Sequence, residues 1–374
     1  MASIGSIDKR PDRPNAPWRV RYRDPAGKEK TRHFARQVDA KRFLDGVRSE
    51  IITGSYVDPE AGRKLFGEYA KEWASMQVHR PSTAYQLDAQ LRHHILPFLG
   101  QRPIGVLRKS ELQAWVKGRS MVLSPATVKV VATWVSTILR AAVDDGLIAS
   151  SPFRGITLPK RDRKQVVPLT TAQVLQLIEL MPEHYRALII TAAGTGLRQG
   201  ELLGLVGDQI DWLGRRLRVD KQLVSLPGRP QQLGPPKSEA SYRSVPLPDV
   251  VLEALALHVQ HHRPGDLGVI FTTATGRAIR RSDIGAVWAP AARSLGLKPG
   301  TGMHALRHYY ASVLISGGES VKVVQARLGH ATAQETLETY AHLWPDSEDR
   351  TRALLDSVLG LRSSSGPGAD QEAL

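Results

Sequence analysis

Residues 304–340 read HALRHYYASVLISGGESVKVVQARLGHATAQETLETY, a succession of short helical patterns that decides the fold of the C-terminal half. His304 and Arg307 stand at i and i+3, so they share one face of the helix that begins at HALRHYY. The sequence LGH closes the helical pattern VKVVQARL and places His330 at a C-terminal turn. The next residues include TAQE, which has the form of a capping box, so Tyr340 is predicted on a new short helix.

These side chains can act together on a phosphate group. A guanidinium such as Arg307 can hold phosphate oxygens with parallel hydrogen bonds, and an imidazole such as His304 can take part in proton transfer. His308 comes one position later and is expected to support packing. A single tyrosine on a helix is usually a core or rim residue, but Tyr340 follows a pair of histidines and can attack phosphorus.

A second candidate segment lies upstream, at residues 192–205 with the sequence AAGTGLRQGELLGL. The GTG turn breaks one predicted helix, and another begins near Arg198. Arg198 and Glu201 then lie in the first turn, where the helix N-terminus also favours an anion. Arg198 would hold a phosphate oxygen while Glu201 orients its neighbours. The alternative is a local Arg–Glu pair on the surface.

A lysine lies between the two segments, in LGPPKSEASYRSVPLP at residues 233–248. Lys237 falls between two predicted strands, and the preceding prolines stiffen its approach. An ammonium held against a phosphate can protonate a leaving alkoxide. The alternative is an ordinary exposed loop lysine.

The order and spacing of these motifs resemble those of the tyrosine recombinase family, the phage integrases, over residues 165–345. The matching motifs are RxxE from Arg198, PPKS around Lys237, HxxRH from His304, LGH ending at His330, and finally Tyr340. The N-terminal segments are similar to the additional DNA-binding domains of three-domain integrases, although that similarity rests on pattern more than on identities.

The resemblance implies how the bonds are broken and made. Tyr340 would attack a DNA phosphodiester and leave a 3′-phosphotyrosine and a free 5′-hydroxyl. Lys237 would be the general acid for the leaving hydroxyl, and His304 would assist proton transfer from Tyr340. The chain is therefore expected to be a site-specific DNA recombinase that integrates or excises a phage or another mobile element.

The resemblance also implies how charge on the phosphate is stabilised. Arg198 and Arg307 would stabilise the transition state, His330 would assist by a hydrogen bond, and Glu201 would be the supporting carboxylate. Fixed guanidinium groups then replace a metal ion, and the covalent intermediate stores the bond energy. No cofactor and no metal are expected.

Composition agrees with a partner of this kind. The 51 Lys and Arg residues exceed the 36 Asp and Glu residues, giving a formal charge of +15, which favours DNA, RNA or an anionic membrane surface. The chain has no cysteine, which excludes disulfides, thiolate metal sites and cysteine nucleophiles. No apolar run approaches the roughly 20 residues of a membrane span. A soluble, cytoplasmic protein is expected, associated with the nucleoid when it binds DNA.

The 374 residues predict several domains, mainly α-helical with small β-sheets. We expect a small sheet plus helix that binds arm-type sites (1–60), a helical bundle that binds core sites (61–150), a linker (151–168), an α+β catalytic domain (169–361) and a disordered tail (362–374). In WRVRYRD, residues 18–24, three arginines alternate with apolar residues and would form a row on one sheet face. That row would contact DNA or, alternatively, protect a sheet edge from aggregation.

The expected partners are double-stranded DNA attachment sites, four protomers on two such sites, and accessory proteins that bend DNA or set direction. Residues 351–361, TRALLDSVLGL, have apolar positions at helical spacing and would dock on a neighbouring protomer or on their own domain. Two other functions share parts of this pattern: a relaxing topoisomerase with the same nucleophile, and a catalytically silent DNA-binding regulator.

Overall fold

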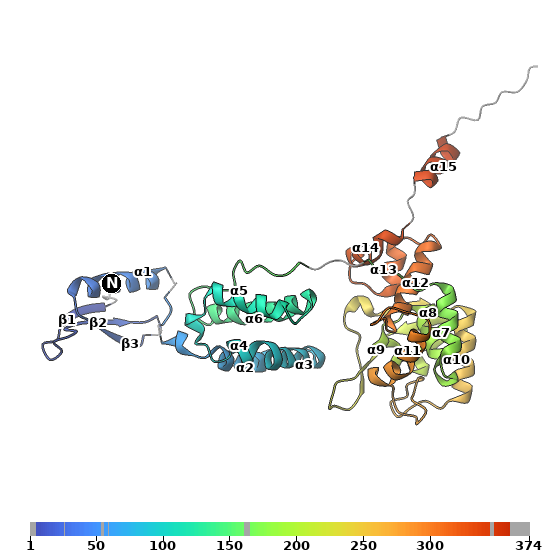
Figure 1. Cartoon of the computed structure of the whole chain (residues 1–374), viewed down its shortest axis with the longest axis horizontal. Helices are drawn as coiled ribbons and strands as arrows, with labels where there is room; N and C mark the ends of the chain where they lie inside the picture. Colours follow the sequence, from blue (N-terminus) through green and yellow to red (C-terminus); the bar gives the residue numbers. More distant parts are fainter. Residues whose placement is uncertain are drawn as a thin grey trace, which may run out of the picture. The chain divides into compact units, whose positions relative to one another are not determined.

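The structure, a computed structural model, describes residues 5–25, 27–53, 56–58, 60–160, 165–344 and 348–359. The chain divides into two compact units, residues 1–163 and residues 164–374 (Figure 1). Helices dominate both units, and the strands form small antiparallel sheets. The predicted fold class is therefore confirmed.

The first unit begins with a sheet in the order β1 (Gly5–Lys9), β2 (Trp18–Arg23) and β3 (Glu29–Phe34). Helix α1 (Gln37–Ile52) packs on one face of this sheet. Val20 and Tyr22 of β2 are buried in the shared core, while Arg21 and Arg23 between and beyond them are exposed. The period of two in WRVRYR predicted this alternation correctly.

Strand β1 was not predicted, and it changes the expected row of arginines. The register places Asp8 of β1 opposite Arg19. Arg19 donates from Nη2 to Oδ2 of Asp8 at 2.6 Å, and Nε of Arg21 lies 3.7 Å from Oδ1 of the same carboxylate. The pKa of Asp8 is held below its usual value, mainly by the hydrogen bond from Arg19. One carboxylate thus partly neutralises the row.

A helical bundle follows, with one core that draws on all of its longer helices. Its elements are α2 (Phe66–Met76), α3 (Pro81–Gln90), a π-helical turn (Leu91–Ile95), α4 (Leu96–Leu99), α5 (Lys109–Ser120) and α6 (Pro125–Asp144). The sequence pattern of residues 82–96 predicts a single helix, but Pro97 lacks the N–H that would bond the carbonyl of His93. The regular α-helix therefore cannot run through this point, and the π-helical turn precedes the proline.

The sequence pattern predicts a helix over residues 125–144, and α6 has these bounds because strong local signals fix its start. Ser124 accepts a hydrogen bond from the backbone N–H of Thr127, and Pro125 occupies the first turn. Among the described residues it is the one helix long and apolar enough to cross a membrane by length and composition. Val131, Val135 and other residues of its apolar face are buried in the bundle core, which accounts for that composition.

The predicted linker packs against protein at both of its described ends. Phe153 is buried in the bundle core. Val166 packs against the small cluster that contains Tyr340, and Leu169 belongs to the main core of the second unit. Residues 161–164 and the predicted tail at 362–374 lie outside the described residues.

The second unit places helices around two small sheets, β4–β5–β8 and β6–β7. Its helices are α7 (Thr171–Leu180), α8 (Glu183–Thr195), α9 (Gln199–Leu203), α10 (Asp249–His261), α11 (Arg281–Ser294), α12 (His304–Ser316), α13 (Val321–Leu328), α14 (Ala333–Tyr340) and α15 (Glu348–Leu359). The strands are β4 (Ile210–Asp211), β5 (Arg216–Val219), β6 (Gln222–Val224), β7 (Gln232–Gly234) and β8 (Arg243–Pro246). The sequence TTAQ at residues 170–173 has the form of a capping box, and Thr170 and Gln173 form one at the start of α7.

Helix α8 packs against both α10 and α12, while α12 also contacts α13 (Figure 1). A separate apolar cluster forms where α12, α13 and α14 meet, and Tyr340 is its largest fully buried side chain. This packing brings the end of α8, the start of α12 and the turn between α13 and α14 to one place.

Candidate active site

Arg198 begins helix α9 immediately after a left-handed turn. Gly196 ends α8 with a φ of 62°, and a Cβ there would lie 2.3 Å from Cδ1 of Tyr310, so glycine is required. The backbone N–H of Arg198 donates to Oε2 of Glu201 at 2.9 Å, and its Nη1 donates to Oε1 at 3.0 Å. The predicted contact of Arg198 with Glu201 in the first turn is present, but Glu201 is buried, so this is not a surface pair.

Glu201 binds a second arginine that sequence reasoning did not identify. Arg243, at the start of β8, donates from Nη2 and Nη1 to the two carboxylate oxygens at 2.8 and 3.2 Å. Burial opposes ionisation of Glu201, but the bonds from Arg243 and Arg198 outweigh it, and its pKa lies below the usual value. No spacing or motif in the sequence distinguished Arg243 from the other arginines of the chain.

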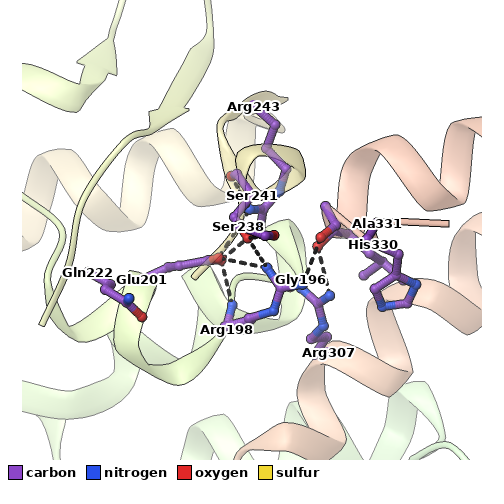
Figure 2. A network of polar contacts seen from close by, with 12 residues as sticks. Gly196, Arg198, Glu201, Gln222, Ser238, Ser241, Arg243, Arg307, His330 and Ala331 are labelled. Carbon is purple, nitrogen blue, oxygen red and sulfur yellow. Dashed lines mark hydrogen bonds and ion pairs between the residues drawn. The ribbon is translucent and has the colours of Figure 1, made fainter. Parts of the chain in front are cut away.

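Arg198 is also tied to two elements distant in sequence. Its Nη1 donates to Oγ of Ser241 at 3.1 Å, and its Nη2 donates to the carbonyl of Gly329 at 2.7 Å. Figure 2 shows Glu201 and Ser241 next to Arg198, with Arg307 and His330 to its right. The guanidinium is therefore fixed before any substrate binds, which is what electrostatic catalysis requires.

Arg307 lies on α12 and is almost fully buried. It donates from Nη1 to the carbonyl of Gly196 and from Nη2 to the carbonyl of Leu328, each at 2.7 Å. Burial, reinforced by the charge of Arg198, lowers the pKa of Arg307 to about 10, so the side chain stays charged at neutral pH. Arg198 and Arg307 thus bond to consecutive carbonyls, those of Gly329 and Leu328, just before His330.

His330 follows Gly329, which ends α13 with a φ of 65°. Its ring is buried, and Nδ1 shares a hydrogen bond of 2.9 Å with Oγ1 of Thr336 on α14. Burial and the charges of Arg307 and Arg198 lower the pKa of His330 to about 3. The ring is therefore neutral at neutral pH and carries one N–H, which limits it to a single donated hydrogen bond.

Tyr340 ends α14 with only 1% of its surface exposed. Its ring stacks on that of His330, with centroids 6.4 Å apart and planes 8° from parallel. Burial raises the pKa of Tyr340 to about 12, although Arg307 acts in the opposite direction. The hydroxyl is accordingly protonated at neutral pH.

The histidine within hydrogen-bonding distance of the tyrosine is His308. Nδ1 of His308 and Oη of Tyr340 lie 2.8 Å apart, within hydrogen-bonding distance. His304 is exposed and its ring packs edge-on against His308, with centroids 4.7 Å apart. Desolvation and the nearby charges of Arg307 and Arg198 lower the pKa of His304. His308, which was expected to support packing, therefore also brings a ring nitrogen to the hydroxyl of Tyr340.

Lys237 stands apart from the network. It lies exposed after β7 and makes no hydrogen bond or ion pair with the part of the chain that the structure describes. The next residue, Ser238, bonds through Oγ to Oγ of Ser241, which accepts from Arg198. The lysine is thus adjacent in sequence to the network without touching it. Across the described residues no group of three or more His, Asp or Glu side chains is placed to hold a metal ion.

Family profiles match most of this architecture. The profile of the Phage integrase family matches residues 168–346, and that of the phage integrase N-terminal SAM-like domain matches residues 65–119, together more than half of the chain. The prophage phiRv2 integrase of Mycobacterium tuberculosis is 27% identical over 353 residues, covering 91% of this chain and 92% of that protein. A XerC-like tyrosine recombinase of Caldanaerobacter subterraneus is 27% identical over 377 residues, covering 90% and 94%.

Solved structures share the fold. A fragment of the Tn1549 transposon integrase in complex with a circular intermediate DNA aligns with a TM-score of 0.69 at 22% identity, covering 79% of this chain and 99% of that one. A lambda integrase tetramer bound to a Holliday junction aligns with a TM-score of 0.56 at 18% identity, covering 90% and 98%. The chain belongs to the phage integrase family of tyrosine recombinases.

Proposed function

We propose that this chain is a site-specific DNA recombinase of the integrase type, which cleaves and rejoins DNA through a phosphotyrosine at Tyr340. The observation that carries the proposal is the convergence of Arg198, Arg307, His330 and Tyr340 from four separate elements of the second unit. Arg198 and Arg307 lie on different helices, yet each donates a hydrogen bond to a backbone carbonyl in the turn that precedes His330.

The geometry supports a division of roles for the transition state. Arg198 and Arg307 stabilise charge on the non-bridging oxygens of the phosphate, because both guanidinium groups are held in place by protein acceptors. His330 donates one hydrogen bond, and Glu201 holds Arg198. Lys237 protonates the leaving 5′ oxygen, which requires its exposed loop to approach the bound DNA. His304, exposed beside His308, assists in moving protons.

Double-stranded attachment sites are the substrate in this proposal. Residues 1–60 bind arm-type sites, residues 61–150 bind core sites, and residues 151–168 link them to the catalytic domain at 169–361. Two arginines exposed on the N-terminal sheet, Arg21 and Arg23, suit a phosphate backbone or a groove. The protein works in the cytoplasm on the DNA of a phage or another mobile element, with accessory proteins that bend DNA and set direction.

Four protomers act together on two sites in the same proposal. Helix α15 presents Leu355, Val358 and Leu359, which are 50%, 72% and 71% exposed. Such side chains are suited to docking on a neighbouring protomer. The tetramer of lambda integrase on a Holliday junction is a precedent for assembly with this fold.

The test is covalent capture from a library of nicked duplexes with random core sequences, in buffer that contains a chelator. A nick close to the random segment lets the released strand diffuse away, so the phosphotyrosine adduct accumulates and survives detergent. We expect adducts that disappear in Tyr340→Phe, with DNA affinity retained. Tyr309→Phe is the matched control, because the Tyr309 hydroxyl contacts Thr171 instead of the network.

Each other outcome has a clear meaning. Tight binding without any adduct would show a DNA-binding regulator. Adducts that only relax supercoiled DNA, without exchange between two selected sites, would show a topoisomerase.

A further inference from the structure

His308 has a contact that the proposed roles leave unused. Its Nδ1 lies 2.8 Å from Oη of Tyr340, the nucleophile of the proposed reaction. The two rings meet edge to face, with centroids 5.6 Å apart. Among the described residues no other side chain forms a hydrogen bond with this hydroxyl, and the ring of His304 packs against that of His308.

The direction of this hydrogen bond follows from the protonation states. Burial raises the pKa of Tyr340 to about 12, so its oxygen carries a proton at neutral pH. Burial, with His304 and Arg307, lowers the pKa of His308 to about 4, so its ring is neutral and has one nitrogen free to accept. A phenol is a stronger donor than a neutral imidazole, and an imidazole nitrogen is a strong acceptor. The hydroxyl of Tyr340 therefore donates to Nδ1 of His308.

We propose that His308 accepts the proton of Tyr340 as the tyrosine oxygen attacks the phosphorus, and returns it when the strand is rejoined. The Oη–P bond forms, the P–O5′ bond breaks, the tyrosine proton passes to Nδ1, and O5′ takes a proton from the general acid, proposed to be Lys237. Rejoining reverses each transfer, so no external base, metal or cofactor enters the balance. This inference rests on the proposed function.

Binding of DNA makes the transfer favourable. The charged or titratable groups facing His308 are His304 and Arg307 on its own helix and Tyr340 on α14. A phosphate held by Arg307 brings negative charge to this cluster, which raises the pKa of His308 toward the range useful for a base. Without DNA the tyrosine stays protonated and inert, which protects the nucleophile until a phosphate is in place.

The experiment measures the rate of adduct formation on the duplex selected with the wild-type protein, across the neutral and alkaline pH range. His308→Asn keeps an amide oxygen that can accept from Tyr340, so it preserves the contact while removing the base. His308→Ala removes both. Thermal unfolding and affinity for the uncleaved duplex confirm that each variant is folded and binds. A second duplex carries sulfur in place of the bridging 5′ oxygen, whose departure as a thiolate needs no proton.

We expect His308→Asn to slow adduct formation by about 100-fold or more at neutral pH, the usual scale for a general base. Its rate should then rise about tenfold per pH unit where the wild-type rate is flat, because the tyrosine must ionise without help. On the sulfur substrate the rate of adduct formation by His308→Asn should remain low, whereas the rate of Lys237→Ala should be restored.

Several results would overturn the inference. A wild-type rate for His308→Asn would show that the ring only positions the tyrosine. A slow variant with an unchanged pH profile would lead to the same conclusion. If the sulfur substrate restored the rate of His308→Asn, the His308 ring would instead act in protonating the leaving 5′ oxygen. Failure of the wild-type protein to form any adduct would overturn the proposed function itself, and with it this inference.

Discussion

Neutralising Glu201 should destabilise the second unit strongly. The carboxylate is 4% exposed and accepts four hydrogen bonds, from the backbone and Nη1 of Arg198 and from Nη1 and Nη2 of Arg243. Glu201→Gln keeps the size of the side chain but leaves two adjacent guanidinium groups without a counter-charge. Removing one partner of a buried ion pair typically costs about 3–5 kcal/mol. We therefore expect a loss of about 3–5 kcal/mol in the free energy of unfolding of this unit.

The assay is urea unfolding of the full chain, followed by hydrogen exchange in peptides from α8 and α12 so that the second unit is observed separately. Asp88→Asn is the control, because Asp88 and Arg92 form an exposed pair on the first unit with side chains 61% and 55% exposed. Such surface pairs contribute about 0–1 kcal/mol. A loss below about 1 kcal/mol for Glu201→Gln would refute the reasoning that this carboxylate anchors both arginines.

The pH dependence of this contribution has a definite sign. The pKa of Glu201 is lowered in the folded state, so its stabilising effect is present above its unfolded pKa, near 4.5. The effect is lost as the pH falls through the folded value. The difference between wild type and Glu201→Gln should shrink in acid, and a difference that grows there would contradict the assignment.

Three further predictions concern the same unit. Thr336→Val should slow adduct formation about tenfold and Thr336→Ser should restore it, since the hydroxyl orients His330, and equal rates for both variants would refute that role. Gly196→Ala should cost about 2 kcal/mol or more by thermal unfolding, because its Cβ would meet Tyr310 at a positive φ, whereas Gly268→Ala, also at positive φ but with open space around it, should cost less. The free energy of unfolding should fall by up to about 1.4 kcal/mol per pH unit from His330 alone as the pH drops from 6.5 to 3. The reason is that the His330 ring takes up a proton in the unfolded state but not in the folded state. The His330→Gln variant should show a flatter slope in acid unfolding curves.

Local signals predicted much of the fold. The serine and proline at the start of α6 fixed its first residue, and the capping box at Thr170 started α7. The glycine after α8 ends that helix and leaves Arg198 as the N-cap of α9. These features depend on neighbours within a few residues, so the sequence contains them directly. Strand β1 escaped prediction because GSIDK is short and lacks a clear apolar alternation, and its pairing with β2 gave it structure.

The sequence by itself determined the class of protein, since the order of Arg198, Lys237, His304, Arg307, His330 and Tyr340 along the chain already resembled a tyrosine recombinase. Only the tertiary structure decided which side chains touch. Arg243 reaches Glu201 across 42 residues of sequence, and His308 instead of His304 reaches Tyr340. His304 and His308 stand at i and i+4, so they lie on nearly the same face of α12. The packing of α14 against α12 decides which of the two reaches Tyr340. Spacing predicts faces, whereas contacts between elements depend on how those faces pack.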